Sequence, residues 1–367
     1  MRRLYLHVGL HKTGTSYLQR LLLLNRGLFA EAGLGLGPYQ NAVTGSHHPI
    51  LGALDRPGGP EAVFARAAEA PGERLLISSE GLSHEIHEKP GYLEAILAAA
   101  SRHFEQRLVI FLRRQDILKE SVYAEAVKGW LEASIQEDDH YPYDHAARLD
   151  RLDAVFGPER VHVALYRDPG PNDILGDLLA ATGTTIDRAR LKPVPPQNVS
   201  THRRNSLFLG QMPKPRNAAT DAADRIAPHF IARVLASSEA IADDGVRYLM
   251  SPRERHALVA AHVEGNRALV ARRGLAHPGA FVALPDPDAP RTPPAPISAA
   301  EVAAVWRECR AACFRSRRNP FAAARMAARV ARLIRPVARR IARDGAASAA
   351  RGVEKSPHDR YEVVRPE

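Results

Sequence analysis

The sequence predicts an α/β protein with a central parallel β-sheet between two layers of helices, and with a helical C-terminal extension. Short apolar runs typical of strands alternate with helical patterns over the first two hundred residues. Such alternation is typical of stacked βα units, which form parallel sheets. With 367 residues, of which 45% are hydrophobic and 25% charged, the chain is also long enough to bury a large core.

The predicted elements of this first part follow in order along the chain. The candidate strands are residues 4–8, 74–78, 108–112 and 161–166. The candidate helices between them are residues 16–32, 92–104, 117–131, 145–156 and 173–182. Gly33, Gly157 and Gly183 directly follow three of these patterns, as expected where a helix ends.

From about residue 200 the strand patterns fade and the sequence becomes helical. Seven prolines between residues 278 and 296 interrupt this part and indicate a linker. The expected helices are residues 222–242, 252–273, 300–318 and 320–343. The predicted organisation is an α/β domain, a proline-rich linker, a basic helical extension and a flexible tail, at residues 1–285, 286–299, 300–345 and 346–367.

The positive charge is concentrated late in the chain. The formal net charge is +10, but residues 1–200 hold 22 basic and 25 acidic residues, whereas residues 201–367 hold 29 and 16. Residues 301–350 alone contain 12 arginines and 3 acids. The positive net charge of the whole chain therefore says nothing about the function of residues 1–200, and no specific nucleic-acid partner is predicted.

The composition favours a reducing, cytoplasmic compartment. The two cysteines, Cys309 and Cys313, are spaced to lie on one helical face, and they leave no disulfide framework. We expect both to be buried thiols. The basic N-terminus lacks the apolar run and cleavage site of a signal peptide, and no apolar run approaches the roughly 20 residues of a membrane span.

A glycine-containing loop follows the first candidate strand. After Val8 the sequence reads Gly-Leu-His-Lys-Thr-Gly-Thr-Ser, and a Leu-rich helical pattern begins at Tyr17. A strand, such a loop and a helix N-terminus together form a phosphate-binding site, because backbone N–H groups and the helix dipole converge on the anion. Four polar residues crowded here are poor core material, which favours binding over a turn that binds nothing.

The order of residues separates this loop from the nucleotide-binding P-loop. Gly9 and Gly14 have P-loop spacing, but Lys12 precedes the second glycine instead of following it. The loop resembles the 5′-phosphosulfate loop of sulfotransferases of bacterial type, which have a three-layer P-loop NTPase-like fold and use 3′-phosphoadenosine 5′-phosphosulfate (PAPS) without a metal. The resemblance implies that the cofactor is bound by His11, Lys12, Thr13, Gly14, Thr15 and Ser16.

A second signature follows the third candidate strand. Arg113 comes directly after this strand, and Ser121 follows eight positions later. In sulfotransferases an arginine and a serine at this spacing bind the 3′-phosphate, so the resemblance implies that role here. Guanidinium geometry suits bidentate phosphate contacts, and open α/β sheets bind ligands at strand ends. The alternatives are a solvated Ser121 and an ion pair of Arg113 with Asp116 or Glu120, while Arg114 is expected to face solvent.

Glu80 follows the second candidate strand and is the predicted general base. Sulfuryl transfer to an alcohol needs a base for the hydroxyl proton and stabilisation of the departing phosphate oxygen. A glutamate at this strand end resembles the base of carbohydrate and tyrosine sulfotransferases. Other branches use histidine, so His11, His84 and His87 are rivals. Lys12 is expected to neutralise the leaving group.

Two further groups of residues are weaker candidates. The aromatic residues after the second signature could stack on an acceptor or belong to the core, and they are Tyr123, Trp130, Tyr141 and Tyr143. The family's chain returns to the cofactor near Asn198, Ser200 and Asn205. Of the basic, glycine-containing motif expected there, only Arg203 and Arg204 are present.

Residues 320–343 combine many arginines with an apolar stripe. The stripe consists of Phe321, Met326, Val330, Leu333, Ile334, Val337 and Ile341. This pattern suits contact with an anionic surface, either the inner face of the membrane or a polyanionic acceptor. A basic amphipathic helix packed on the domain or on a partner subunit explains it equally well.

These observations together predict an enzyme, a cytoplasmic sulfotransferase without a bound metal. It is expected to transfer a sulfuryl group from PAPS to a hydroxyl, with a carbohydrate or glycolipid as the favoured acceptor. One alternative is a P-loop small-molecule kinase using ATP and Mg²⁺, although neither the second nor the third candidate strand ends in the aspartate that would hold the metal. The other alternative is a non-catalytic module that binds anionic polymers or membranes through the basic tail.

Overall fold

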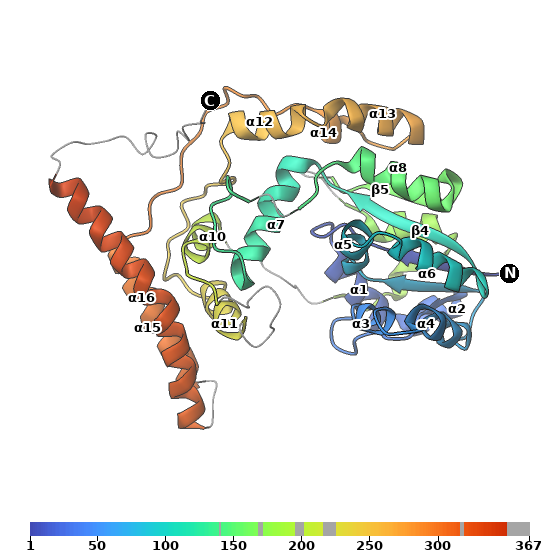
Figure 1. Cartoon of the computed structure of the whole chain (residues 1–367), viewed down its shortest axis with the longest axis horizontal. Helices are drawn as coiled ribbons and strands as arrows, with labels where there is room; N and C mark the ends of the chain where they lie inside the picture. Colours follow the sequence, from blue (N-terminus) through green and yellow to red (C-terminus); the bar gives the residue numbers. More distant parts are fainter. Residues whose placement is uncertain (139–140, 168–171, 195–201, 216–224, 316–318, 351–367) are drawn as a thin grey trace. The chain divides into compact units, whose positions relative to one another are not determined.

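Five parallel strands form one sheet in the order β2-β3-β1-β4-β5. The strands are β1 (Arg2–His7), β2 (Leu34–Leu36), β3 (Arg74–Ser78), β4 (Phe104–Leu112) and β5 (Val161–Leu165). This computed structural model describes residues 1–138, 141–167, 172–194, 202–215, 225–315 and 319–350 (Figure 1). The sheet lies in the first of two compact units, which comprises residues 1–122, 139–199 and 251–290.

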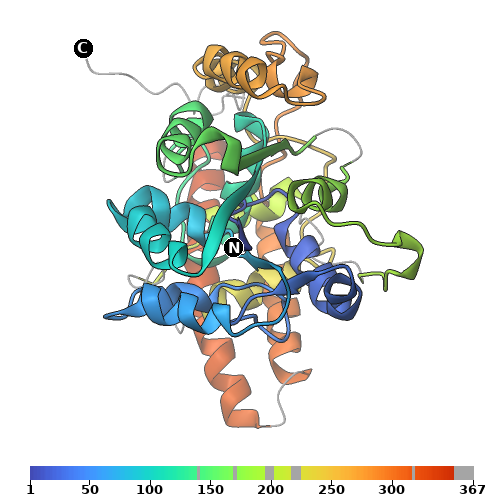
Figure 2. The ribbon, with the colours of Figure 1, turned by 90° about the vertical axis from the view of Figure 1, so that its right-hand side faces the viewer.

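Helices cover both faces of the sheet, as Figure 2 shows. One face packs against α1 (Thr15–Leu24), α2 (Arg26–Glu31) and α9 (Ile174–Thr182). The other packs against α3 (Pro49–Leu54), α4 (Gly59–Ala68), α6 (Tyr92–Ser101) and α8 (His145–Phe156). Leu4 and Leu6 of β1 point into the second layer and Tyr5 into the first, because successive strand residues face opposite sides. The predicted three-layer α/β fold is confirmed.

Most predicted elements lie at or near their observed positions, but strand β4 begins at Phe104 instead of residue 108, and several helices, among them α3 and α4, were not predicted. The predicted helix 16–32 is divided at Asn25, whose side chain donates to Leu21 O at 2.9 Å and accepts from Lys192 N at 2.7 Å. Strand β2 was not predicted, because it has only three residues and exists through its pairing with β3. The predicted helix 252–273 is likewise two helices, α12 (Pro252–Ala260) and α13 (Val263–Arg273).

The strand order creates a switch point at the carboxyl ends of β1 and β4. The chain leaves β1 toward β2 and β3 on one side, and it leaves β4 toward β5 on the other. In open parallel sheets, ligands bind in the crevice at such a point. The registers pair His7 with Ser78 of β3 and with Val109 of β4, so the loops after these three strands leave the same edge.

The second unit is helical and comprises residues 123–138, 200–250 and 291–367. Its helices are α10 (Arg203–Gly210), α11 (Ile226–Leu235), α15 (Ala299–Arg315), α16 (Pro320–Ala350) and the C-terminal part of α7 (Gln115–Gly129). In this unit α15 and α16 pack side by side, and α11 packs against both (Figure 1). Residues 200–250, which the sequence assigned to the α/β domain 1–285, are thus grouped with the C-terminal helices.

Helices α5 (Gly81–Glu88) and α14 (Gly279–Val282) complete the α-helices of the described residues. Cys309 and Cys313 are buried free thiols on α15, as predicted, and burial raises the pKa of Cys309 to about 12. In the part of the chain that the structure describes, every helix is too short or too polar to cross a bilayer.

Candidate anion-binding and catalytic site

The loop between β1 and α1 is shaped by two glycines. Gly14 caps α1 with a φ of 79°, and its carbonyl accepts the Leu18 N–H, so the helix starts at the loop. Gly9 has a φ of 95°, and a Cβ atom on it would lie 2.8 Å from the Cβ of Glu80. Only glycine combines this conformation with this close approach. The N-terminus of α1 is therefore directed at the loop, next to Glu80.

The polar side chains of the loop differ in burial and in hydrogen bonding. Thr13 is fully buried, and its hydroxyl donates to Leu10 O at 2.7 Å, so this side chain stabilises the conformation of the loop. Of the Thr13 donors, only the backbone N–H is left to contact an anion. Thr15 is 4% exposed, whereas Lys12 and Ser16 are partly exposed. Lys12 has a φ of 63°, in the left-handed region, and its backbone carbonyl accepts a hydrogen bond from Arg113, which follows β4.

Arg113 connects the loop to the second signature. Its Nη1 donates to Lys12 O at 2.8 Å and to Ser121 Oγ at 2.9 Å. The backbone carbonyl of Arg113 is in turn bonded to His145 Nε2 at 2.8 Å, and burial lowers the pKa of His145 to about 4, so it is neutral at pH 7. Residues 101 positions apart in the sequence are thus brought together at the switch point of the sheet.

Arg114 does not face solvent, contrary to the expectation from the sequence. Arg114 forms a bidentate ion pair with the buried carboxylate of Asp116: Nε donates to Oδ1 at 2.7 Å and Nη2 donates to Oδ2 at 3.0 Å. Arg255 donates to the same carboxylate at 2.6 and 2.9 Å. Asp116 therefore joins α7 to α12, where it balances two arginines within the first unit.

Glu80 is contacted on both carboxylate oxygens. Oε2 accepts from Gln19 Nε2 at 2.8 Å, and Oε1 lies 3.6 Å from His48 Nε2. Burial raises the pKa of this carboxyl, but His48, the Glu80 backbone N–H, His11 and the Gln19 amide together lower it by more. The pKa lies below its usual range, so Glu80 is ionised at neutral pH and can accept a proton.

The histidines near Glu80 are not equivalent. His11 belongs to the loop itself, and burial lowers its pKa to about 4, so its ring is neutral at pH 7. His84 and His87 are exposed on α5. His48 was missed by the sequence analysis, because nothing in the pattern of its loop relates it to Glu80. The neighbouring His47 fixes this loop through Gly37 O, at 3.1 Å, and through the Ser78 N–H.

Two tyrosines border the site. The Tyr141 ring meets the His11 ring edge to face, with 6.3 Å between centroids. Tyr166, which follows β5, lies under the Arg113 guanidinium at 5.1 Å and near Gly14. Tyr166 was not a candidate from the sequence, although its place directly after a strand of the sheet was a usable signal. Tyr123 is a buried residue of the second unit that donates to Ala133 O at 3.0 Å.

Comparison with known proteins gives one structural similarity. No family model matches the chain, and no curated protein matches it. The chain is similar to the crystal structure of a sulfotransferase from Alicyclobacillus acidocaldarius, with 20% identity and a TM-score of 0.35, over 62% of this chain and 96% of that one. The sheet order and the loop geometry of this chain carry the arguments that follow.

The candidates near residue 200 divide into two groups. Asn198 and Ser200 lie outside the described residues. Arg204 and Asn205 are buried in the second unit, at 5% and 1% exposure. Arg204 forms a bidentate pair with Glu301 at 2.7 and 2.8 Å. Burial raises the pKa of the Glu301 carboxyl, but Arg204 together with hydrogen bonds from Ser298 and the Ala242 N–H lowers it to about 2. Arg204 therefore holds the second unit together.

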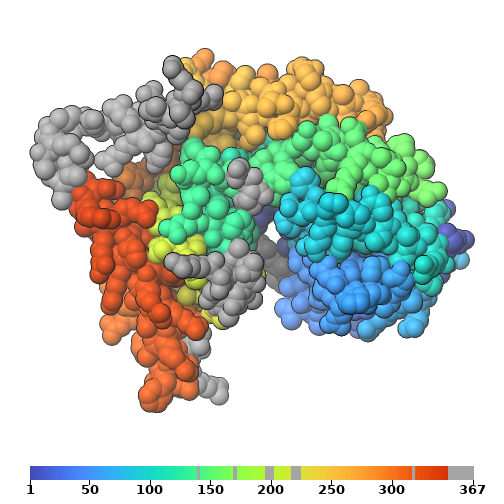
Figure 3. All heavy atoms as spheres, viewed as in Figure 1, coloured from blue at the N-terminus to red at the C-terminus, as the bar shows by residue number. Residues whose placement is uncertain are grey.

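The apolar stripe of α16 is covered for most of its length. Met326, Val330 and Val337 are between 0% and 4% exposed, and Phe321 is 78% exposed. The buried part of the stripe packs against α15 and α11. This agrees with the prediction that a basic amphipathic helix packs on the rest of the chain. The arginines of α16 remain on the surface, and Figure 3 shows the outer side of this helix uncovered.

Three chemical functions thus meet at one edge of the sheet. The loop after β1 presents a helix N-terminus, Arg113 and Ser121 follow β4, and the ionised Glu80 follows β3. Among the described residues no group of three or more His, Cys, Asp and Glu side chains is placed to hold a metal ion. The arrangement can bind an anionic ester and accept a proton beside it.

Proposed function

We propose that the protein is a sulfotransferase that transfers a sulfuryl group from PAPS to a hydroxyl acceptor in the cytoplasm, with a carbohydrate or glycolipid as the acceptor. The observation that supports this most is the contact of one guanidinium, that of Arg113, with both Lys12 O and Ser121 Oγ. A nucleotide with phosphates at its 5′ and 3′ positions needs two anion sites that are held at a fixed separation. The Arg113 contacts couple two such segments.

The residues present fit this donor. The helix N-terminus at Gly14 suits the 5′-phosphosulfate, and Arg113 with Ser121 suits the 3′-phosphate. In the proposed reaction the acceptor oxygen bonds to sulfur while the bond from sulfur to the phosphate oxygen breaks. Glu80 takes the hydroxyl proton, and Lys12 stabilises the charge of the leaving phosphate. The products are a sulfate ester and adenosine 3′,5′-bisphosphate.

A calorimetric titration tests this proposal directly. Adenosine 3′,5′-bisphosphate is titrated in EDTA, and ATP with Mg²⁺ is titrated in parallel. Tight binding of the bisphosphate without metal is the expected result. Binding of ATP with Mg²⁺ alone would replace the sulfotransferase by the small-molecule kinase, and binding of neither nucleotide would leave a non-catalytic module.

Replacing Arg113 with alanine should weaken binding of adenosine 3′,5′-bisphosphate by about 10- to 150-fold. Loss of charge-assisted hydrogen bonds costs about 1.5–3 kcal/mol. Arg102→Ala is the matched control, because Arg102 is an exposed arginine at the C-terminus of α6. Its dissociation constant should equal that of the unmodified protein. An unchanged affinity in Arg113→Ala would remove this residue from the site.

We also propose that the α15–α16 pair contacts an anionic membrane surface. Seven exposed arginines of α16 occupy one helical sector of roughly 140°, at about 100° per residue, and they are Arg325, Arg329, Arg332, Arg335, Arg339, Arg340 and Arg343. Phe314 and Phe321, 49% and 78% exposed, lie near the end of α15 and the start of α16, respectively. A polyanion needs only the arginines, whereas a lipid surface also uses exposed aromatic side chains.

Co-sedimentation with lipid vesicles tests this contact. Vesicles containing phosphatidylglycerol should bind the protein, and vesicles of phosphatidylcholine alone should not. The triple change Arg332→Gln, Arg335→Gln, Arg339→Gln and the double change Phe314→Ser, Phe321→Ser should each lower binding at least tenfold. The control replaces three exposed arginines elsewhere, namely Arg26, Arg56 and Arg102. Binding to heparin but not to anionic vesicles would show that the arginines serve a polyanion instead.

A further inference from the structure

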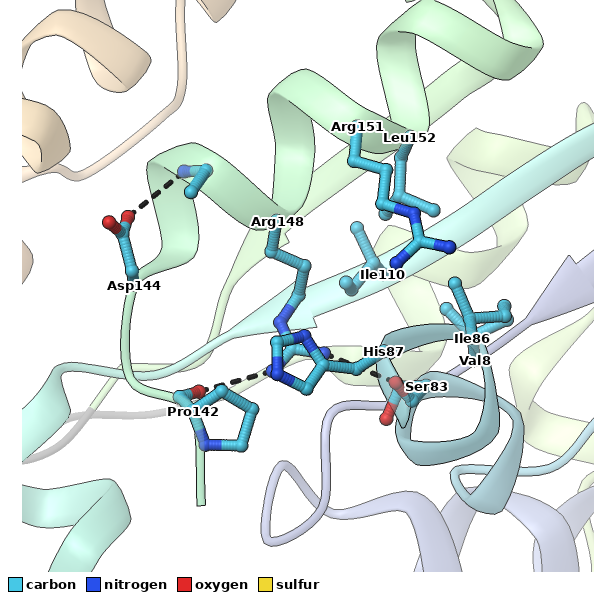
Figure 4. Close-up of a pocket in the computed structure, with 11 residues that line it drawn as sticks. Val8, Ser83, Ile86, His87, Ile110, Pro142, Asp144, Arg148, Arg151 and Leu152 are labelled. Atoms are coloured by element: carbon cyan, nitrogen blue, oxygen red, sulfur yellow. Dashed lines mark hydrogen bonds between the residues drawn. The ribbon is translucent and has the colours of Figure 1, made fainter. Parts of the chain in front are cut away.

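A cavity of about 190 Å³ lies in the first unit, between the sheet and helices α5 and α8. Its apolar lining includes Val8, Ile110, Ile86 and Leu152. Figure 4 shows Arg148 and Arg151 extending from α8 toward α5, where His87 also lines the cavity. The cavity thus combines apolar walls from the sheet and helices with two guanidinium groups from one helix.

The two arginines are not neutralised by acids. Neither Arg148 nor Arg151 forms an ion pair with a carboxylate in the described part of the chain. Arg148 bonds two backbone carbonyls, Ser83 O at 3.2 Å and Pro142 O at 3.1 Å, and its Nε has no hydrogen-bond partner among the described residues. Arg148 also lies over the Tyr141 ring at 5.9 Å, and Arg151 is half-buried. Buried charges are normally paired with opposite charges, so the Arg148 guanidinium without a carboxylate partner favours binding of an anion in the cavity.

The charges around these arginines leave the cavity positive. Asp144 is the acid among its lining residues, and its carboxylate caps α8 by accepting the Ala147 N–H at 2.9 Å. Burial and, after it, Arg148 lower the pKa of His87, which indicates the same positive potential. Burial also lowers the pKa of Arg148 itself, a cost that an anionic ligand would remove.

The cavity adjoins the candidate base. Val8 directly precedes Gly9 of the loop. Ser83, which lines the cavity, donates its hydroxyl to Glu80 O at 2.8 Å, so the lining begins one helical turn, about 5.4 Å, from Glu80. The cavity therefore borders both the loop after β1 and the segment that carries Glu80.

We propose that this cavity binds the acceptor, and that the acceptor carries a carboxylate on a ring-sized body with an apolar face. This inference rests on the proposed sulfotransferase activity and names its substrate class. The volume agrees with one ring, since a cavity of about 150 Å³ accommodates benzene. Arg148 and Arg151 bind the carboxylate, the walls contact the ring, and the hydroxyl points toward Glu80. Aromatic hydroxy acids and uronic acid sugars both carry this chemistry.

Binding of matched acid and neutral probes, measured by calorimetry without nucleotide, tests the proposal. The first pair is 4-hydroxyphenylacetate and 4-hydroxyphenylacetamide, and the second is methyl β-glucuronide and methyl β-glucoside. In at least one pair the acid should bind about tenfold or more tightly than its neutral partner. The pair that shows the difference identifies the source, aromatic or sugar. Equal binding within both pairs, or no binding of either acid, would overturn the proposal.

Variants of the two arginines separate the anion contact from the fold. Arg151→Gln should remove the preference for the acid, and Arg148→Lys should reduce it while keeping a charge at the cavity. The control Arg102→Gln should bind the acid as the unmodified protein does. A preference that survives Arg151→Gln and Arg148→Lys would overturn the proposal. If the protein binds the acid probe but not adenosine 3′,5′-bisphosphate, the proposed sulfuryl donor is wrong and the acid site remains. The failure of the proposed function can thus be told apart from the failure of the acid site.

Discussion

Replacing Glu80 with glutamine is expected to lower the turnover number by about 10²- to 10⁴-fold while leaving the affinity for adenosine 3′,5′-bisphosphate unchanged. The change removes the proton acceptor, and loss of a general base typically has this magnitude. The amide is nearly isosteric with the carboxylate, so the contact with Gln19 and the close approach of Gly9 are preserved. Sulfate ester formation under saturating donor measures the turnover.

The pH dependence of the same reaction provides a second measurement. Glu80 must be deprotonated to act, and its pKa lies below the usual range of a glutamate. Activity should therefore persist into mildly acidic solution and fall only as the pH passes below that range. Glu88→Gln is the control and should retain full turnover, because Glu88 is an exposed residue at the end of α5, the helix that follows Glu80. Normal turnover in Glu80→Gln would transfer the role to a histidine.

Replacing Arg204 with methionine should destabilise the second unit by about 3–5 kcal/mol. The guanidinium of Arg204 donates to Glu301 on both oxygens and to the carbonyls of Ala242, Ala295 and Pro296. Removing one partner of a buried pair leaves an uncompensated charge, which costs about this amount. Urea unfolding followed by circular dichroism measures the change, and the free energy of unfolding should fall.

A matched neighbour and a double variant make this result specific. Arg203→Met should cost less than about 1 kcal/mol, because Arg203 donates to Arg247 O at an exposed site. Changing both Arg204→Met and Glu301→Leu should recover part of the lost stability, since neither charge then remains buried alone. If Arg204→Met leaves the midpoint of unfolding unchanged, Arg204 does not hold the second unit together.

Much of the α/β architecture could be predicted from the sequence, because the start, end and type of a helix or strand depend largely on residues that are adjacent in the chain. Helix α8 was predicted at its observed residues, since Asp144 caps its start and Gly157 follows its end. Four of the five strands of the first unit were predicted from short apolar runs. The short strand β2 was not predicted, because three residues carry no periodicity and only β3 makes them a strand.

For the candidate site, the sequence alone determined the loop 9–16, the spacing of Arg113 and Ser121, and the place of Glu80 after a strand. These are local patterns, and the parallel sheet then brings the strand ends to one edge. Only the tertiary structure decided that Gln19 and His48 contact Glu80.

The tertiary structure likewise decided the roles of the arginines. Arg114 and Arg204 read alike in the sequence as exposed cations or weak ligands. In the structure, Arg114 shares the buried Asp116 carboxylate with Arg255 from a distant segment, and Arg204 binds Glu301. Arg148 and Arg151 carried no signal at all, and they line a cavity without acidic partners. The reason is physical, because backbone conformation follows from adjacent residues, whereas the partner and the burial of a long charged side chain depend on segments far away along the chain.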